Sequence, residues 1–246
     1  MENSIYLGLS RQMALRTDMD IIANNVANMN TPGFRGQNLI FQEYLDTHRR
    51  TGEVGADDPL SFVVDDGQYQ VTDPGPVRVT GNPLDISVNG PGFIGIQGPG
   101  GKVAYTRAGN FQLSPDGTLM TPAGYPVASQ GGGGITIPQG SSEIKIDGRG
   151  VVSNQDGQLG QIMLVEFENI QQLNPLGNNL YTTDAAVKNA DNSVVAQGQL
   201  EGSNIKPVIE MTRMIDTLRS FQSVQNVLQA ENERLRTAIQ RLTGQN

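Results

Sequence analysis

Residues 207–242 read PVIEMTRMIDTLRSFQSVQNVLQAENERLRTAIQRL, and this stretch decides the fold. Its apolar residues alternate at spacings of three and four, which is typical of a long helix that packs against other helices. Pro207 is tolerated in a first helical turn, and neither Gly nor Pro follows it within the stretch. At about 1.5 Å per residue this helix is roughly 54 Å long. The two rows of the apolar seam are Met211, Leu218, Gln225, Asn232 and Ile239, and Met214, Phe221, Leu228, Leu235 and Leu242.

A second long helix is expected at residues 4–29, and Pro32 predicts that it ends near residues 28–30. Its seam positions, spaced by four, three, four and three, are Leu15, Met19, Ile22, Val26 and Met29. Asn25 borders this stripe, either as a polar edge residue or as a buried amide that fixes register at an interface. At about 1.5 Å per residue the helix is roughly 40 Å long and covers only part of the C-terminal helix. The two helices pair in an antiparallel or parallel manner and leave apolar surface for another subunit.

The middle of the chain has the pattern of a β domain. Short alternating runs such as LDISV (84–88), FIGIQ (93–97) and QIMLVEF (161–167) are separated by turn signals such as Asp156-Gly157. Turns every 8–12 residues or so predict an antiparallel sandwich or barrel. No helical period interrupts the block, which argues against a parallel βαβ architecture. The predicted class is therefore α+β: a coiled-coil-like arm of two terminal helices and a central antiparallel all-β domain.

Four segments follow from this pattern. The N-terminal helix and the β block are joined by a connector of mixed character, which resumes a strand pattern toward its end. The predicted segments are an N-terminal helix (1–33), the connector (34–76), the β domain (77–200) and a C-terminal helix (201–246).

Composition excludes several classes of function. The net charge of −8 and the isoelectric point near 4.6 argue against binding to nucleic acid or to anionic lipid surfaces. The chain has no cysteine, so disulfides and thiol chemistry are absent. No apolar run approaches 18 residues, so no membrane insertion is expected. The N-terminal residues lack the basic and apolar regions of a secretory signal, and export without a cleaved signal is expected.

Motifs of catalytic or cofactor sites have structural explanations here. Residues 90–95 match G-x-G-x-x-G, but a strand rather than a helix is expected to follow, so the match is interpreted as a glycine-rich turn. His48 is the only histidine, and a lone histidine without cysteine makes no typical zinc site. The Asp-Gly pairs are turn formers. The sequence therefore predicts no catalytic, cofactor-binding or metal-binding residue, and no cofactor.

Two segments at the helix ends carry a resemblance to a known family. ANNVANMNTPGFR (23–35) resembles the N-terminal signature of bacterial flagellar rod and hook proteins, and GQLEGSN (198–204) resembles the matching C-terminal signature. LDISVNGPGFIGI (84–96), YTRAGNFQLSPDGTL (105–119) and GNNLYTT (177–183) resemble β segments shared by the family. The opening residues 5–25 are more similar to proximal-rod than to distal-rod members, and the chain is too short for a hook subunit.

The resemblance implies a structural role in motility. The terminal helices would form an inner tube around an export channel, and the β domain would form an outer layer. Implied partners are copies of the chain, other rod subunits and the flagellar type III export apparatus, at the basal body between the two membranes. The alternatives are a distal-rod or hook-type subunit, or a ligand-binding β domain carried on oligomerisation helices.

The residues expected to bury surface within and between subunits come from both helices. Polar Gln225 and Asn232 would lower stability but fix register between subunits. The predicted interface residues are Leu15, Met19, Ile22, Asn25, Val26, Met214, Leu218, Phe221, Gln225, Leu228, Asn232, Leu235 and Leu242.

Overall fold

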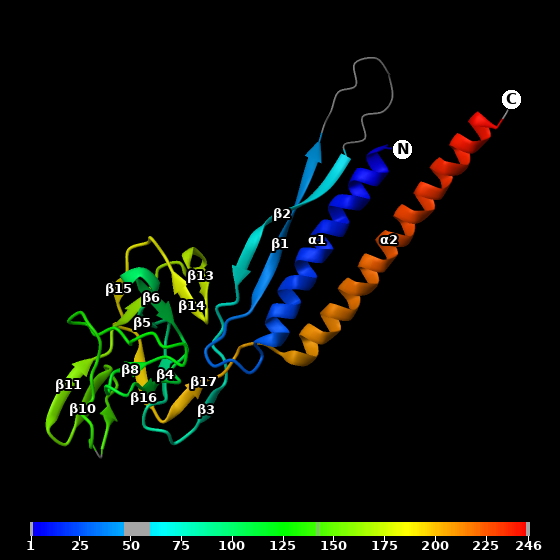
Figure 1. Cartoon of the computed structure of the whole chain (residues 1–246). Coiled ribbons are helices and arrows are strands. Elements are labelled where there is room, and N and C mark those ends of the chain that lie inside the picture. Colours follow the sequence, from blue (N-terminus) through cyan, green and yellow to red (C-terminus); the bar gives the residue numbers. More distant parts are fainter. Residues whose placement is uncertain (1, 47–59, 142, 245–246) are drawn as a thin grey trace. The chain divides into compact units, whose positions relative to one another are not determined.

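The computed structural model describes residues 2–46, 60–141 and 143–244 (Figure 1). The chain divides into two units, and each is built from segments distant in sequence. The helical unit comprises Met1–Ala27, Gln37–Tyr69 and Lys206–Asn246. The β-rich unit comprises Asn28–Gly36 and Gln70–Ile205. Among the helices of the described part, none combines the length and the apolar character needed to span a membrane.

The helical unit pairs α1 (Glu2–Ala27) with α2 (Pro207–Thr243). Contacts between them run in opposite directions along the two helices: Gly8 meets Leu228, Asp18 meets Thr217, and Asn25 meets Glu210. The pair is therefore antiparallel, which decides between the two arrangements that the sequence left open. Strands β1 (Gln37–Asp46) and β2 (Leu60–Gln70) form a two-stranded sheet in the segment predicted as a connector.

Local chemistry explains where the helices end and begin. After Ala27, Asn28 accepts a hydrogen bond from the Thr31 amide on its carbonyl oxygen (3.1 Å), which forms a turn in place of another helical turn. Gly33 has a φ of +66°, a left-handed conformation that suits glycine. Pro207 occupies the first turn of α2, where its missing N–H costs no intrahelical bond. Glu210 lies in that first turn and Arg241 in the last, so both charges complement the helix dipole.

The β-rich unit is built from short strands, and every pairing described in it is antiparallel. Its largest sheet has six strands in the order β13-β14-β6-β5-β12-β15; a three-stranded sheet β11-β10-β9 and the pairs β16-β4, β17-β3 and β7-β8 complete it. The strands are β3 (Val77–Val79), β4 (Ile86–Asn89), β5 (Phe93–Gln97), β6 (Val103–Thr106), β7 (Gln112–Leu113), β8 (Leu119–Met120), β9 (Lys145–Ile146), β10 (Val151–Asn154), β11 (Gly157–Gln161), β12 (Leu164–Glu166), β13 (Asn174–Gly177), β14 (Leu180–Thr182), β15 (Lys188–Asn189), β16 (Val194–Gln197) and β17 (Gln199–Glu201), with 3-10 turns at Pro99–Gly101 and Ile170–Gln172.

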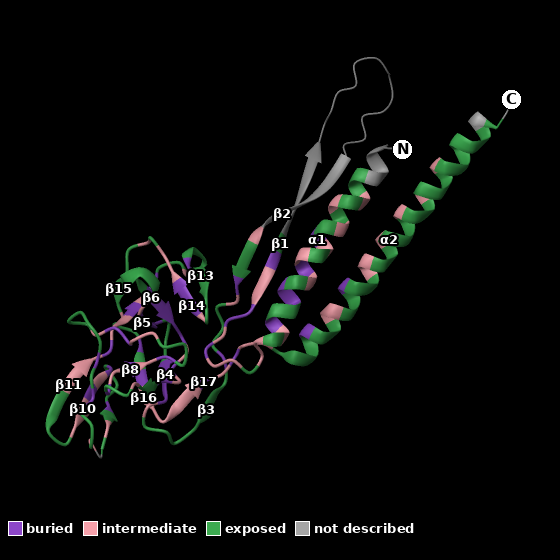
Figure 2. Ribbon diagram, viewed as in Figure 1, coloured by how far each residue is buried: buried purple, intermediate pink, exposed green. Residues whose placement is uncertain are grey.

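Two apolar clusters form the core of the β-rich unit. The larger one contains aliphatic side chains such as Ile86, Ile94 and Leu119, which are fully buried. The smaller one is aromatic: Phe167 meets Phe93 edge-on with ring centroids 5.4 Å apart and meets Tyr105 at 4.9 Å. Edge-to-face pairs of this kind add to the stabilisation from burial. Figure 2 shows these buried positions among exposed turns.

The buried tyrosines of the aromatic cluster predict a loss of stability at high pH. Burial raises the pKa of Tyr105 and of Tyr181, although Arg35 partly opposes this for Tyr181. Because the folded pKa exceeds the unfolded value of about 10, the neutral tyrosines stabilise the fold fully below that pH. This stabilisation is lost as the pH rises through the folded pKa. Chemical denaturation from pH 8 to 11 measures it. We expect Tyr181→Phe to flatten this loss and Tyr6→Phe, at an exposed position, to leave it unchanged; an unaltered pH dependence in Tyr181→Phe would refute the assignment.

The α+β class, the antiparallel strand pairings and the two long helices are confirmed. The coiled-coil packing and the sandwich or barrel closure stay predictions. The interpretation of the G-x-G-x-x-G match as a glycine-rich turn followed by a strand is confirmed: residues 90–92 precede strand β5, which begins at Phe93, where a nucleotide site would need a helix. His48 lies outside the described residues.

Candidate functional site

The apolar seam of α2 separates into two rows that differ in exposure (Figure 2). The inner row contains half-buried side chains: Met214, Phe221, Leu228 and Leu235. The outer row contains exposed side chains: Met211, Leu218, Gln225, Asn232 and Ile239. A Cβ built at Gly8 of α1 would lie only 2.6 Å from Leu228 Cδ2, so the inner row faces α1 within the same chain. Leu242 lies in α2, and its side chain lies outside the described part of the structure.

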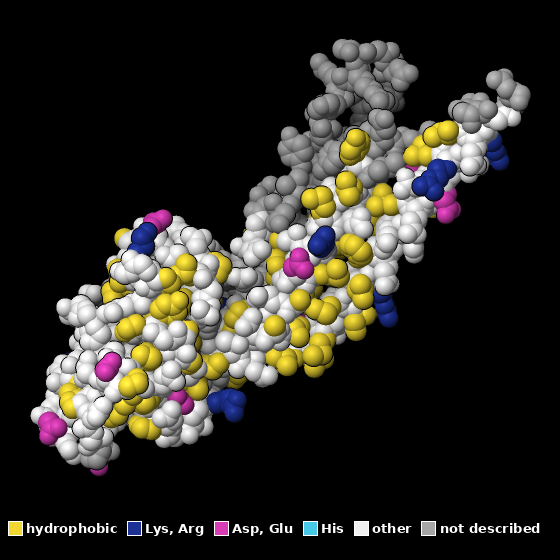
Figure 3. All heavy atoms as spheres, viewed as in Figure 1, with side chains coloured by type: hydrophobic (Ala, Val, Ile, Leu, Met, Phe, Trp, Pro, Cys, Tyr) yellow, Lys and Arg dark blue, Asp and Glu magenta, His cyan; other side chains and the backbone are white. Residues whose placement is uncertain are grey.

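The outer row belongs to a wider apolar surface on the helical unit. Met211, Leu218 and Ile239 are 48%, 43% and 58% exposed, and Ile215 beside them is 51% exposed. Figure 3 shows hydrophobic side chains along both helices. On α1 the exposed members include Leu9 and Met13. An apolar surface that continues along two helices is typical of a site for association with other proteins.

On α1 the buried positions are shifted from the predicted ones. Ile22 is fully buried, whereas Leu15, Met19 and Val26 are half-buried. The buried stripe also includes residues that the apolar pattern did not single out: Ala14, Asp18 and Ile21. Asn25, for which the sequence left an edge position and a buried position open, is buried. The sequence missed Asp18 because a charged side chain ordinarily faces solvent.

These polar members form a hydrogen-bonded network inside the helical unit. Asn25, 1% exposed, donates to the Gln37 carbonyl (2.8 Å) and to Glu210 Oε2 (3.1 Å), and its Oδ1 accepts from the Gln37 amide (3.0 Å). Thr217 donates to Asp18 Oδ2 at 2.9 Å. Arg213 lies 3.5 Å from Asp18 Oδ1 and 3.2 Å from Glu210 Oε1. Because Asp18, Asn25, Glu210 and Thr217 are buried, only the observed register of α1 against α2 satisfies their polar groups.

We therefore expect Asn25→Leu to destabilise the isolated chain by roughly 2 kcal/mol or more. The substitution leaves the Gln37 amide, its carbonyl and a Glu210 oxygen without their partner, and each buried unpaired group costs about 1–3 kcal/mol. Denaturant unfolding followed by helical circular dichroism measures the effect. Asn232→Leu, at an exposed position of α2, is the control and should change stability by less than about 0.5 kcal/mol. Equal effects of the two variants would contradict the assignment of Asn25 as the internal register residue.

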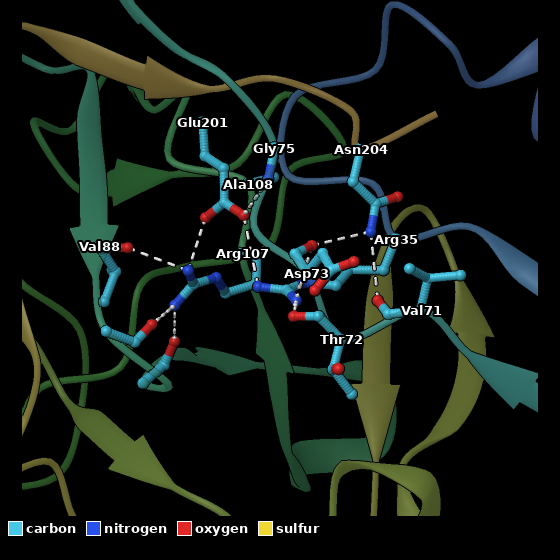
Figure 4. Close-up of polar contacts among 12 residues, drawn as sticks. Arg35, Val71, Thr72, Asp73, Gly75, Val88, Arg107, Ala108, Glu201 and Asn204 are labelled. Atoms are coloured by element: carbon cyan, nitrogen blue, oxygen red, sulfur yellow. Dashed lines mark hydrogen bonds and ion pairs between the residues drawn. The ribbon is translucent and has the colours of Figure 1, made fainter. Parts of the chain in front are cut away.

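A second site lies within the β-rich unit, where a carboxylate is held between two arginines (Figure 4). Glu201, at the end of β17, lies 3.3 Å from Arg35 Nη2 through Oε1 and 2.7 Å from Arg107 Nη2 through Oε2. The three residues, here called the ion cluster, are 3%, 4% and 2% exposed, respectively. Buried charges persist only when they are paired and hydrogen-bonded, and this site provides both.

Each arginine of the ion cluster also binds backbone carbonyls. Arg107 donates to Val88 (3.0 Å), Gly90 (2.9 Å) and Gly92, and its guanidinium lies 5.7 Å from the centroid of the Phe93 ring. Burial lowers the pKa of Arg107, Glu201 opposes that shift, and the nearby charge of Arg35 adds to it.

Arg35 connects the ion cluster to the segment that follows β2. It donates to the Thr72 carbonyl and to the Asp73 carbonyl (3.2 Å). The cluster thereby connects the segment after α1, the segment after β2, strand β6 and the strand that precedes α2.

Hydrogen bonds around the ion cluster join the same chain segments. Asn204 donates to the carbonyls of Val71 (3.2 Å) and Asp73 (2.9 Å), and its Oδ1 accepts from the Gly36 amide (2.8 Å). The Gly33 amide donates to the Glu201 carbonyl at 2.8 Å. Every point at which the chain leaves the β-rich unit is therefore close in sequence to a residue held at this site.

Two glycines permit the close approach of these segments. A Cβ at Gly75 would lie 2.0 Å from the Gly202 carbonyl oxygen, and one at Gly33 would lie 2.3 Å from the Arg107 carbonyl carbon. Both distances are far below any van der Waals contact, and the neighbouring atoms are backbone. Gly33 and Gly75 are therefore required because a side chain at either position would overlap the backbone of another segment.

Chemically, this site joins chain segments. Its charged groups bind one another and backbone carbonyls, and among the residues that the structure describes no group of three His, Cys, Asp or Glu side chains could hold a metal ion. The sequence predicted joints at residues 23–35 and 198–204 but did not identify Arg35, Arg107 and Glu201. The available signal was the single charged residue in each of three otherwise uncharged motifs: GFR, YTR and LEG.

Three family models match the chain. Residues 5–35 match the flagella basal body rod protein, residues 87–154 match the flagellar hook protein FlgE/F/G D1 domain, and residues 196–241 match the flagellar basal body rod FlgEFG protein C-terminal. The first and third matches contain the segments that flank the ion cluster, and the second contains Arg107.

Relatives match along almost the whole chain. It is 38% identical to the flagellar basal-body rod protein FlgF of Caulobacter vibrioides over 98% of both chains. It is 34% identical to FlgF of Mesorhizobium japonicum over 91% of this chain and 90% of that protein. It is also 34% identical to FlgG of Caulobacter vibrioides, over 94% of this chain and 96% of that protein. With its two helices, its antiparallel β-rich unit and its motifs gathered at one site, the chain belongs to the flagellar basal-body rod protein family.

Proposed function

We propose that the protein is a structural subunit of the bacterial flagellar basal-body rod. In this role it assembles with copies of itself and with other axial proteins into the hollow drive shaft that transmits motor torque. The observation that carries the proposal is the outer row of α2, which leaves apolar side chains exposed in a chain related over its whole length to rod proteins. A structural subunit needs such a surface because its partners are supplied by the assembly.

The two rows of α2 have different roles in this proposal. The inner row holds α2 on α1, and the outer row contacts helices of neighbouring subunits, which together form a coiled-coil-like tube. Burying one side chain of the outer row, such as Leu218, is worth about 1.5–3 kcal/mol. Several such contacts per subunit are sufficient to hold a rod against torque.

Gln225 and Asn232 have a separate role in the assembly. Both lie in the exposed outer row, so their amides are placed to pair with a neighbour rather than within the chain. We propose that they fix the register between subunits at some cost in stability. The other predicted interface residues, including Leu15, Met19 and Val26, lie at the edge of the α1–α2 contact and complete the tube from that side.

Within the rod we place the subunit in the proximal segment. Residues 5–25 resemble proximal-rod members, and the match to FlgF of Caulobacter vibrioides covers 98% of both chains at 38% identity, compared with 34% for FlgG of the same organism. The distal rod is the second candidate, because FlgG relatives also match over most of the chain. The subunit reaches this place between the two membranes as an unfolded chain, through the flagellar type III export apparatus and without a cleaved signal.

We propose no catalytic role and no cofactor. The buried charges of the ion cluster bind one another and the backbone, and this use explains their burial without a substrate. Among the residues of the β-rich unit that the structure describes, no specific contact supports a ligand-binding role, the remaining alternative.

Electron microscopy of isolated basal bodies tests the proposal. An epitope inserted in the exposed turn at residues 131–134 labels the β-rich unit without touching either helix. We expect label on the outside of the rod, in its proximal segment. Label on the distal rod would favour the second candidate, and basal bodies without label would refute the structural role.

A further inference from the structure

The ion cluster brings together three residues that are far apart in the sequence. Arg35 follows the first helix, Arg107 follows β6, and Glu201 lies at the end of β17 (Figure 4). Arg35 and Arg107 are both buried, and one carboxylate lies between them at 3.3 Å and 2.7 Å. The charge balance of this interior therefore depends on a residue in the last quarter of the chain.

Without Glu201 the two guanidinium groups would be adjacent buried cations. Their repulsion is present even in the native state, where the charge of Arg35 lowers the pKa of Arg107. An arginine does not lose its proton at ordinary pH, so neither cation can be neutralised except by a partner. A buried charge whose partner is removed is strongly destabilising, by far more than the loss of an exposed pair.

The position of Arg107 carries this effect into the core. Its guanidinium binds carbonyls of the segment from Val88 to Gly92, which comprises the end of β4 and the turn before β5, and it contacts the ring of Phe93 in the aromatic cluster. Strands β5 and β6 pair directly, with Ile94 opposite Thr106. An uncompensated charge on Arg107 therefore acts on the central strands of the six-stranded sheet, not only on a surface turn.

The N-terminal segment depends on the same late residues. Besides the Arg35–Glu201 ion pair, the Gly33 amide binds the Glu201 carbonyl, and the Asn204 amide binds the Phe34 carbonyl at 3.3 Å. The Gly75 amide donates to Glu201 Oε1 at 3.2 Å. Residues 33–36 and Gly75 therefore dock on backbone and side-chain groups that exist only once residues 201–204 are in place.

We propose that Glu201 makes the folding of the β-rich unit conditional on the C-terminal end of the chain. Until residues 201–204 dock, the unit contains two unpaired buried cations and an undocked N-terminal segment, and it does not reach its native state. An incomplete chain therefore stays unfolded even when all strands up to β16 are present. For a subunit that travels as an unfolded chain this prevents early folding; that use rests on the proposed function, whereas the folding behaviour does not.

Refolding of the full-length chain, followed by pulsed hydrogen exchange, tests the inference without any rod assembly. A negative result for this inference is therefore distinguishable from a negative result for the proposed structural role. In Glu201→Gln we expect amides of β5 and β6 to gain protection about tenfold more slowly than in the unchanged chain, and the folding equilibrium constant to fall about 100-fold or more. Glu166→Gln is the matched control: Glu166 accepts hydrogen bonds from Ser193 and Asn192 in the same unit but lies outside the ion cluster. It should leave the refolding rate of β5 and β6 within about twofold.

The result that would contradict the proposal is a loss of protection confined to the residues around Glu201. If β5 and β6 become protected at the normal rate in Glu201→Gln and only amides such as Gly33 and Gly75 lose protection, Glu201 stabilises only the chain ends and the proposal is wrong. If Glu201→Gln populates no native state, the double variant Arg35→Gln/Glu201→Gln is used to test whether the unpaired buried cations prevent folding. We expect it to regain protection in β5, because one of the two buried cations has been removed. A double variant as unprotected as the single one would overturn the inference.

Discussion

Leu218→Asp should abolish rod assembly and swimming while the isolated chain folds normally. Leu218 is 43% exposed in the outer row of α2, so an aspartate at this position remains hydrated in the free chain and changes its stability by less than about 0.5 kcal/mol. In an assembled tube the same carboxylate would be buried against a neighbouring helix without a partner. That penalty is several kcal/mol for an unpaired ion, which exceeds the gain of about 1.5–3 kcal/mol from the leucine it replaces.

The matched variant is Leu228→Asp in the inner row. Leu228 contacts Gly8 of α1, so the aspartate separates the two helices of one chain and lowers stability in the isolated protein as well. Thermal unfolding of purified chains and motility in soft agar together distinguish the two rows. Normal swimming of a strain with Leu218→Asp would contradict the assignment of the outer row to subunit contacts.

Gly75→Ala should unfold most of the β-rich unit. The added Cβ would lie 2.0 Å from the Gly202 carbonyl oxygen and 2.8 Å from its carbonyl carbon. Both are backbone atoms in a segment fixed by Glu201 and Asn204, so no side-chain rotation relieves the overlap. We expect a loss of more than about 4 kcal/mol, the range in which single substitutions reflect a specific steric or electrostatic conflict.

Gly131→Ala is the control for this substitution. A Cβ at Gly131 would have Ser129 Oγ at 4.0 Å as its neighbour, and the residue lies in an exposed turn. Its stability should match that of the unchanged chain or exceed it slightly, because alanine narrows the unfolded ensemble. Denaturant unfolding monitored at the tyrosines reports on both variants. A Gly75→Ala chain with a normal unfolding midpoint would refute the close packing of residues 75 and 202.

The helices and the strand-rich middle could be predicted because their signals are periodic and local. Pro207 and the spacing of three and four along α2 place that helix within a residue or so of its observed start. The strands β1 and β2 were less visible, since their segment mixes polar residues with short apolar runs and was expected to be a connector. The pairing of β1 with β2 joins two separate segments and depends on tertiary contacts, which the local pattern does not contain.

The candidate site was harder to predict because its decisive residues are polar. Asp18 and Glu210 interrupt the apolar stripes, and a sequence pattern assigns such residues to the surface. In the structure they are buried because each meets a partner from another segment. Glu201 and Arg107 lie almost a hundred residues apart, and nothing in either local motif indicates that they form a pair.

The division of the α2 seam was also beyond the sequence. Both rows have the same apolar spacing, so periodicity alone cannot show which row packs within the chain and which is exposed. Only the placement of α1 shows that Met214 and Leu228 are partly covered while Met211 and Leu218 remain exposed. The predicted interface residues therefore fall into a set that faces α1 and a set available to other subunits.

Disulfide cross-linking in isolated basal bodies can test whether the outer row of α2 contacts neighbouring subunits, because the chain has no cysteine of its own. A single cysteine is introduced at Leu218 in the outer row or at Met214 in the inner row, and mild oxidation is followed by denaturing electrophoresis. We expect cross-linked species from Leu218→Cys, formed either between two copies or, when a neighbouring axial protein carries a cysteine on its own helix, with that protein. We expect none from Met214→Cys. Efficient cross-linking at Met214 with none at Leu218 would contradict the assignment of the outer row to subunit contacts.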